Sequence, residues 1–297
     1  MARVRTNGIE LEYEIFGSEH GEPLVLIMGL GAQMILWRDD FCHMLVERGY
    51  RVIRFDNRDV GRSTWLDHLG LPNVMALMAA AASGQPVEAP YKLTDMAADT
   101  AGLLDALGIG RAHIVGASMG GMIAQTFAIQ YPERTLSLTS IMSTTGDPTL
   151  PPPRPEALSV LLAPQPTSRE EAIERGVFIF RTIGSPKYFD EAEVRELAAR
   201  SFDRGINPAG VMRQLAAILA SGNRTEALRQ VQKPVLVIHG RIDPLVPFAA
   251  GEATARALPR ARLLAFEDMA HDLPRPLWPD MVAAIHEVAE EAKRDGK

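Results

Sequence analysis

The chain has 297 residues, of which 46% are hydrophobic and 23% are charged, and its formal net charge is −6. This length allows one large α/β domain, or such a domain with an inserted cap, and the composition excludes a disordered chain. No dense cluster of Lys and Arg is present, so we do not expect the protein to bind nucleic acid or an anionic membrane surface.

The chain contains one cysteine, Cys42, which excludes an intramolecular disulfide and a cysteine-based metal site. Cys42 falls in an apolar stretch with Trp37, Phe41 and Leu45, which predicts a small buried side chain rather than a reactive thiol. No signal-peptide core precedes the first strand pattern, and the most apolar stretch, residues 74–82, is too short to cross a bilayer. We therefore expect a cytoplasmic protein.

In chain order, the first predicted strand covers residues 9–15, where apolar residues alternate with glutamates as in a half-exposed strand. Short apolar runs follow, and they favour strands that are covered on both faces, as in a parallel sheet. These runs are residues 23–28, 51–55, 112–115, 136–142, 235–238 and 262–266.

Helical patterns lie between these runs, at residues 94–108, 119–131 and 279–293. Thr94 is the predicted N-cap of the first helix, and Pro132 ends the second. Because strands and helices alternate, we predict an α/β fold with a doubly wound, mostly parallel sheet of about eight strands.

The alternation breaks after the strand at residues 136–142, where a segment dense in turn residues is followed by further helical patterns. We predict a helical cap domain over residues 143–223, inserted into a core domain of residues 1–142 and 224–297. A second irregular stretch, residues 64–91, forms either a further wall of the pocket or a surface loop with one short helix. The helical patterns in the cap lie at residues 170–181, 191–203 and 208–220.

The motif that carries chemistry is G-x-S-x-G, formed here by Gly116, Ser118 and Gly120. It lies between a predicted strand and a predicted helix, which is the context that a nucleophile elbow requires. The glycines are needed because side chains at these positions would collide with neighbouring backbone, and the start of the helix favours developing negative charge. We predict Ser118 as a nucleophile; the alternative is a purely structural glycine-rich turn.

A serine hydroxyl needs a base that accepts its proton, and in hydrolases with this elbow the acid and then the histidine follow the serine in the chain. Asp243 follows the predicted strand at residues 235–238, and His271 follows the one at 262–266. Both therefore lie in loops at the carboxyl edge of the sheet, together with Ser118. We predict His271 as the general base and Asp243 as the acid that orients it.

Other candidates fit this arrangement less well. His239 precedes the acid in the chain and is interpreted as a satisfied core or rim histidine, and His113 opens a strand at the opposite edge. Asp147 follows an earlier strand and is the alternative acid. Asp268 and Asp272 stand too close in sequence to the proposed base to orient it easily, so we interpret them as solvated loop carboxylates.

The chain resembles the α/β-hydrolase superfamily over nearly its whole length. The resemblance rests on the loop that begins at Met28, the run at residues 56–63, the elbow at Ser118, residues 240–247, and His271. Within the superfamily the chain resembles the aclacinomycin methylesterase-like group, in the M-G pair after the strand, the run F-D-N-R-D-V-G-R-S and the elbow G-A-S-M-G-G.

This resemblance implies an oxyanion hole formed by the backbone N–H groups of Leu30 and Met119. Many relatives have His-Gly where this chain has Met28-Gly29, which leaves the donor at Leu30 intact but removes a side chain that often supports the loop. The arginines and aspartates of residues 56–63 are interpreted as tying that loop to the core by charge-assisted hydrogen bonds, not as catalytic groups.

These residues predict a serine carboxylesterase that hydrolyses small to medium carboxylic esters through an acyl-enzyme. Alternatives on the same triad are methyl-ester cleavage of aromatic polyketides, lactone opening, C–C hydrolysis and perhydrolysis; a different class is a non-catalytic binding protein. The predicted pocket includes Met28, Met122, Phe178 and Leu215. We expect no metal or organic cofactor, because the chain lacks the corresponding motifs, and the sequence leaves the oligomeric state open.

Overall fold

The protein is built on one eight-stranded sheet in a computed structural model, which describes residues 1–163 and 166–295. The strands are β1 (Ala2–Thr6), β2 (Ile9–Phe16), β3 (Glu22–Ile27), β4 (Tyr50–Phe55), β5 (Ala112–Ala117), β6 (Thr135–Ile141), β7 (Val235–Gly240) and β8 (Ala261–Phe266). Their order in the sheet is β1-β2-β4-β3-β5-β6-β7-β8. The pairs β1–β2 and β2–β4 are antiparallel and the others are parallel, which confirms the predicted fold class.

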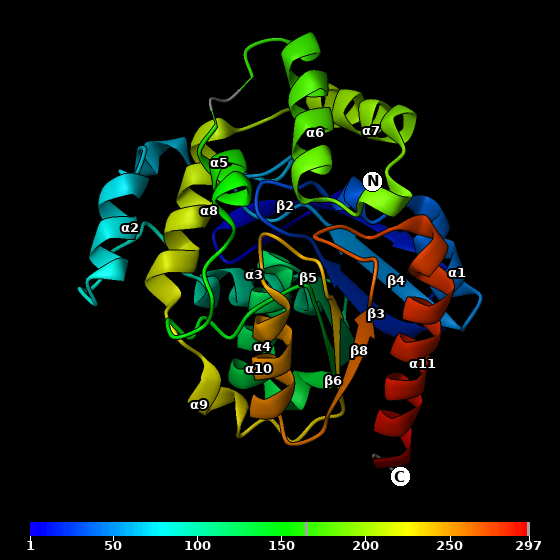
Figure 1. The fold of residues 1–297 in the computed structure, drawn as a ribbon. Helices are drawn as coiled ribbons and strands as arrows, with labels where there is room; N and C mark the ends of the chain where they lie inside the picture. The colour runs from blue at the N-terminus through cyan, green and yellow to red at the C-terminus, as the bar shows by residue number, and fades with distance from the viewer. Residues whose placement is uncertain (164–165, 296–297) are drawn as a thin grey trace.

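The helices connect these strands and cover the sheet (Figure 1). The α-helices are α1 (Asp39–Val46), α2 (Val74–Ala82), α3 (Leu93–Ala106), α4 (Met119–Gln130), α5 (Pro155–Leu162), α6 (Arg169–Ile183), α7 (Glu191–Arg204), α8 (Pro208–Ser221), α9 (Thr225–Leu228), α10 (Phe248–Ala257) and α11 (Trp278–Asp295). Short 3₁₀ turns are η1 (Met34–Leu36), η2 (Asp67–Leu69), η3 (Pro132–Arg134), η4 (Pro186–Tyr188) and η5 (Arg275–Leu277).

Both faces of the sheet are buried, as the continuous apolar runs predict. In β3, Leu24 and Leu26 join the core under α1 and α11, whereas Val25 and Ile27 join the core under α3 and α4. Each fully buried side chain of this kind contributes roughly 1.5–3 kcal/mol relative to exposure. The two cores therefore hold the parallel strands rigidly and fix the positions of the loops at their carboxyl ends.

The structure differs from the sequence-based expectations at one strand and one helix end. The edge strand β1 was not predicted, because its arginines and short length leave little hydrophobic pattern, and its residues are mostly exposed or half-buried. Helix α3 begins at Leu93, and the Asp95 carboxylate accepts a hydrogen bond of 2.7 Å from the backbone N–H of Lys92. Thr94 is therefore inside the helix, and its prediction as the N-cap was wrong.

Residues 143–223, which we call the inserted segment, lead from β6 through α5, α6, α7 and α8. In Figure 1, α6 and α7 stand at the top of the view, above the strands of the sheet. The predicted helices at 170–181, 191–203 and 208–220 correspond to α6, α7 and α8. Helices α6 and α7 of the inserted segment therefore lie at one end of the sheet, whereas α8 runs beside α2.

The stretch at residues 64–91 contains η2 and α2, and α2 contacts α8 of the inserted segment. Most of α2 is exposed or half-buried, and Met75 is 62% exposed. Of the two alternatives for this stretch, the structure therefore favours a surface segment with one short helix. No helix in the described ranges is both long and apolar enough to cross a membrane.

Candidate active site

Ser118 occupies a strained turn between β5 and α4, with φ +56° and ψ −121°. A Cβ atom on Gly116 would lie 2.0 Å from the carbonyl oxygen of Gly120, and a Cβ on Gly120 would lie 2.1 Å from that of Ile27. Only glycine fits at both flanking positions, so the sharp turn requires these two residues. The turn places the Ser118 hydroxyl at the N-terminus of α4.

The structure brings Ser118, His271 and Asp243 together from three loops. The Nε2 atom of His271 lies 3.0 Å from Ser118 Oγ, and its Nδ1 atom lies 2.7 Å from Asp243 Oδ2. Because an ionised carboxylate can only accept, Nδ1 is the nitrogen that donates to Asp243, which leaves Nε2 of the neutral imidazole as the acceptor for the proton of the serine. Asp243 Oδ1 accepts hydrogen bonds from the backbone N–H groups of Leu245 and Val246, at 2.9 and 2.8 Å, which fix the acid.

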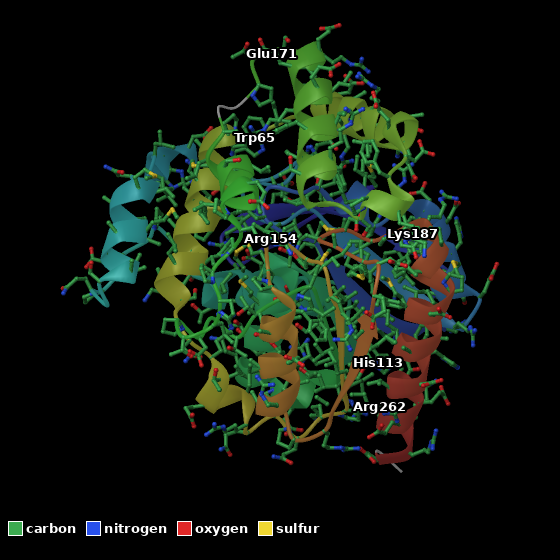
Figure 2. All side chains as sticks on the ribbon, viewed as in Figure 1. Trp65, His113, Arg154, Glu171, Lys187 and Arg262 are labelled. Carbon is green, nitrogen blue, oxygen red and sulfur yellow. The ribbon has the colours of Figure 1, made fainter. Side chains whose placement is uncertain are left out.

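The other candidates from the sequence, Asp147, His239 and His113, have different partners. Asp147 accepts hydrogen bonds from the backbone N–H and the hydroxyl of Thr149, at 2.9 and 2.7 Å, and these bonds lower the pKa of its carboxyl. His239 is fully buried, and burial lowers its pKa; its Nε2 lies 2.8 Å from the carbonyl oxygen of Val246. His113 lies toward the opposite end of the sheet from the inserted helices, as Figure 2 shows.

The predicted oxyanion donors are the backbone N–H groups of Leu30 and Met119. Neither the N–H of Leu30 nor that of Met119 donates a hydrogen bond to another residue in the part of the chain that the structure describes. Gly29 lies against the nucleophile: a Cβ atom there would be 3.1 Å from Ser118 Cβ. Two free N–H groups beside the serine are what a developing oxyanion requires.

Two side chains support the loop that carries Leu30. Asn57 Nδ2 donates to the carbonyl oxygen of Met28 at 2.9 Å, and Gln214 Oε1, from α8, accepts from the N–H of Gly31 at 2.8 Å. Gln214 is fully buried, and its Nε2 also donates to the carbonyl oxygen of Arg58. These contacts hold the loop in a chain that has Met28 in place of a histidine. Sequence reasoning missed Gln214, because its partner lies far away in the chain.

The charged residues 56–63 have the structural role that was predicted. They pair with residues of the core and also with residues of the inserted segment. Arg58 pairs with Asp99 of α3 at 2.6 Å. Asp59 forms two hydrogen bonds with Arg213 of α8, at 2.8 and 2.7 Å, and Asp56 pairs with Arg204 of α7. This loop therefore fastens the inserted segment to the sheet.

Trp65 lies beside this loop, where the inserted segment meets the core, and is labelled in Figure 2. Its indole Nε1 donates to the carbonyl oxygen of Gly61 at 3.0 Å. A Cβ atom built on Gly205, which follows α7, would lie 3.3 Å from the indole ring. The side chain is nevertheless 41% exposed, so it touches both regions and the solvent.

Of the two carboxylates near His271 that were predicted to be solvated, one is not. Asp268 is exposed, as predicted, and pairs with Lys187 at 2.5 Å. Asp272 is not a solvated loop carboxylate: it accepts hydrogen bonds from the backbone N–H and the hydroxyl of Ser185, and burial raises its pKa. The inserted segment covers Asp272, which could not be known before its helices were placed.

The predicted pocket residues do not share one environment. Met28 and Met122 are buried and belong to the cores on opposite faces of the sheet, and Leu215 is buried on α8. Phe178 is 49% exposed, whereas its neighbour Val177 is buried. Phe178 is therefore not part of an enclosed wall, and the structure does not support its assignment to the pocket.

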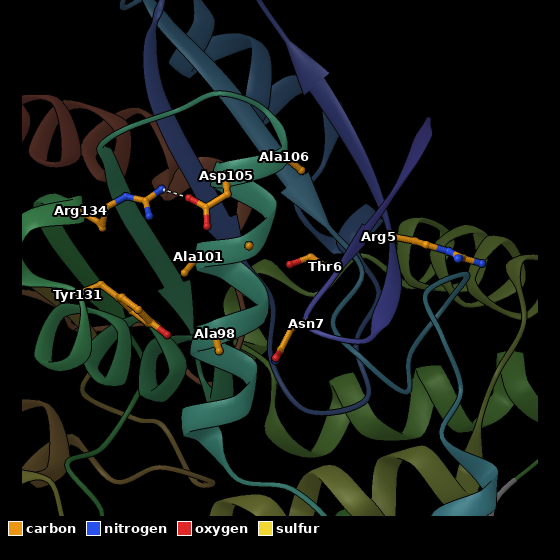
Figure 3. A pocket seen from close by; sticks show the side chains of 10 residues that line it. Arg5, Thr6, Asn7, Ala98, Ala101, Asp105, Ala106, Tyr131 and Arg134 are labelled. Atoms are coloured by element: carbon orange, nitrogen blue, oxygen red, sulfur yellow. Dashed lines mark ion pairs between the residues drawn. The ribbon is translucent and has the colours of Figure 1, made fainter.

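An open groove of about 590 Å³ lies away from these residues, between β1 and α3 (Figure 3). Thr6 and Asn7 line it on one side and Ala98 and Ala101 on the other, and it contains neither the serine nor the histidine of the candidate site. Among the described residues, no group of His, Cys, Asp and Glu side chains is arranged to hold a metal ion.

The fold and the site together have the geometry that serine hydrolases use: a serine at a strained strand-to-helix turn, a histidine and a buried aspartate at the carboxyl edge of a parallel sheet. The chain also matches the family model described as alpha/beta hydrolase fold over residues 22–274. The chain therefore belongs to the α/β-hydrolase fold family, and it is an enzyme of that family.

Individual relatives agree with this assignment. The chain is 32% identical to rhodomycin D methylesterase DnrP of Streptomyces peucetius, with 95% of this chain and 96% of that protein covered. It is 31% identical to rhodomycin D methylesterase DauP of Streptomyces sp. (strain C5), with 93% and 94% covered. The solved structure of the enol-lactonase from Burkholderia xenovorans LB400 has the same fold, with a TM-score of 0.72 at 22% identity and with 97% and 99% covered. The resemblance read from the sequence is confirmed, including its methylesterase group.

Proposed function

We propose that this protein is a serine carboxylesterase that hydrolyses small to medium carboxylic esters. The observation that carries the proposal is the continuous series of hydrogen bonds from Asp243 through His271 to Ser118, at 2.7 and 3.0 Å. The sequence similarity to two methylesterases supports an ester as the substrate.

In the proposed reaction, Ser118 Oγ attacks the ester carbonyl carbon while its proton passes to His271 Nε2. The N–H groups of Leu30 and Met119 stabilise the negative charge on the carbonyl oxygen, each by about 3 kcal/mol. The C–O bond to the alcohol then breaks, and His271 returns the proton to the leaving alcohol. A water molecule, deprotonated by His271, releases the acid and restores Ser118.

The inserted segment is proposed to act as the cap of this site. It lies at the end of the sheet where open α/β sheets bind ligands. Gln214 of α8 bonds to the loop of the proposed oxyanion donor, and the backbone N–H of Arg154 donates to the carbonyl oxygen of Pro244, next to Asp243. These contacts support a cap that shapes the substrate pocket over residues 143–223.

Methyl-ester cleavage of a bulky aromatic compound is the second candidate. The specific observation in its favour is the 32% identity to an enzyme named rhodomycin D methylesterase over nearly the whole chain. This reaction would use the same three residues and would differ only in the pocket.

The test is a screen of p-nitrophenyl acetate and butyrate, simple lactones, and methyl esters of aromatic polyketides, with Ser118→Ala as the control. Turnover of at least one ester class should fall by about three orders of magnitude or more in the variant, because loss of a triad member removes most of the catalysis. Full activity in a correctly folded Ser118→Ala protein would disprove the mechanism. Preference for methyl esters of polyketides over p-nitrophenyl esters would establish the second candidate.

A further inference from the structure

The loop that carries His271 is bonded to the end of α6 in the inserted segment. The backbone N–H of His271 donates to the carbonyl oxygen of Ile183 at 2.8 Å. The N–H of the preceding residue, Ala270, donates to Ser185 Oγ at 2.8 Å. These two bonds hold the backbone at His271 and at the residue before it.

Asp272 completes the contact from the other side of His271. Its Oδ2 accepts from the backbone N–H of Ser185 at 3.0 Å, and its Oδ1 accepts from the Ser185 hydroxyl. Ser185 Oγ therefore accepts from Ala270 and donates to Asp272 at the same time. One serine binds the residues immediately before and after the histidine.

In this contact Ser185 is buried and Asp272 is half-buried. Ser185 is 1% exposed. A Cβ atom on Gly184 would lie 2.5 Å from the carbonyl oxygen of Phe180 and 3.1 Å from Asp272 Oδ2, so a larger residue could not follow α6 here. Hydrogen bonds to a carboxylate are among the stronger ones in proteins, and the buried Ser185 hydroxyl would cost free energy if it lost its partners.

The ring of His271 uses its two nitrogens for Asp243 and Ser118, so its backbone must be fixed by other groups. We propose that Ser185 and Asp272 are positioning residues, which hold His271 through its neighbours so that Nε2 stays within reach of the Ser118 hydroxyl. The inserted segment is thus part of the catalytic apparatus as well as a cover. This inference rests on the proposed function of the same site.

The same two segments provide a matched control. Lys187 and Asp268 also join the inserted segment to the histidine loop, at 2.5 Å, but their side chains are 60% and 50% exposed. Such an exposed pair contributes little. Asp268→Asn and Asp272→Asn therefore remove the same charge from the same loop, and only the second changes the contact with the buried Ser185.

The experiment measures kcat and KM for p-nitrophenyl butyrate and the rate of inactivation by phenylmethylsulfonyl fluoride, which reports serine reactivity without a natural substrate. Asp272→Asn and Ser185→Ala should each lower kcat and the inactivation rate by about 10- to 100-fold with KM nearly unchanged, since small misplacements of catalytic groups have effects of this size. Asp268→Asn should stay within about twofold of wild type on all three. The double variant Ser185→Ala/Asp272→Asn should be no slower than the worse single variant, because the two side chains act as one unit.

Three outcomes would overturn the inference. One is a rise in KM at unchanged kcat; another is an Asp272→Asn protein as active as Asp268→Asn. The third is additive losses in the double variant. If Asp272→Asn does not fold, the inference is tested by the kcat and inactivation rate of Ser185→Ala, which removes a single oxygen. A wild-type protein that neither hydrolyses the ester nor reacts with the fluoride would instead disprove the proposed function, and this inference with it.

Discussion

Two buried clusters of charged side chains lie where the inserted segment meets the core, and they differ in the partner that each carboxylate has. In one cluster, Asp59 faces the guanidinium of Arg213, at 2.8 and 2.7 Å. In the other, Asp243 faces His271, whose second nitrogen lies beside Ser118. An arginine holds its proton at any ordinary pH, whereas an imidazole can accept a proton and return it.

The comparison shows that burial and charge do not by themselves mark a catalytic site. Both clusters contain an aspartate with almost no exposed surface. Only the cluster with a histidine between an acid and a hydroxyl can move a proton. Variants of the Ser118 cluster should therefore change the rate, and variants of the Arg213 cluster should change the stability.

The largest expected effect is on the rate. Asp243→Asn should lower kcat/KM for an ester by about 10⁴-fold, because a neutral amide cannot stabilise the imidazolium that forms at His271. Asp147→Asn should leave kcat/KM within about twofold, since the Asp147 carboxylate accepts its hydrogen bonds from Thr149 in its own turn. Steady-state kinetics on the two purified variants measure this difference. The opposite ranking would show that the acid is Asp147, in the loop after β6.

The next effect is on stability. Asp59→Asn should lower the free energy of unfolding by about 3–5 kcal/mol, because it removes the charge of the buried carboxylate that pairs with the buried guanidinium of Arg213. Asp67 also contacts Arg213, at 2.8 Å, but its side chain is 62% exposed. Asp67→Asn should therefore cost no more than about 1 kcal/mol. Urea denaturation followed by circular dichroism compares the two.

The kcat of the Asp59 variant provides a second test of this prediction. The folded Asp59→Asn protein should retain a kcat within severalfold of wild type, since no catalytic atom has changed. Equal destabilisation by the Asp59 and Asp67 variants, or loss of kcat in folded Asp59→Asn, would remove the distinction between the clusters.

The smallest effect is the pH dependence of that stability. Burial alone would raise the pKa of Asp59, but hydrogen bonds from Arg213, the N–H of Leu66 and the hydroxyl of Tyr91 lower it below 3.8. Because the folded pKa lies below the unfolded value, the stabilisation is present above about pH 4 and is lost as the pH falls through the folded pKa. The gap between wild type and Asp59→Asn should therefore narrow by no more than about 1 kcal/mol between pH 5 and pH 3. Urea midpoints at several pH values test this, and a constant gap would contradict it.

The residues proposed for catalysis could be found from the sequence because each stands in a local pattern. Ser118 follows a strand and opens a helix between two glycines, and Asp243 and His271 each follow a strand in the parallel sheet. Parallel strands place such loops at one edge whatever the rest of the chain does. The fold class follows from the same patterns.

The groups that support these residues could not be found in this way. Ser185 and Asp272 are separated by 87 positions, and Gln214 and Gly31 by 183. Whether such pairs meet depends on how the inserted helices rotate and pack, which helical periodicity does not determine. The same limit explains Phe178: the pattern marks an apolar face on α6, but only packing decides that Val177 is buried and Phe178 is not.

The position of Trp65 has a consequence for spectroscopy. The chain has three tryptophans, and Trp37 and Trp278 are buried, whereas Trp65 is 41% exposed beside Gly205. Iodide in solution should therefore quench the emission of Trp65 far more than that of the other two. A change in this quenchable fraction when a ligand is added would report movement of the inserted segment against the core, without any label being attached to the protein.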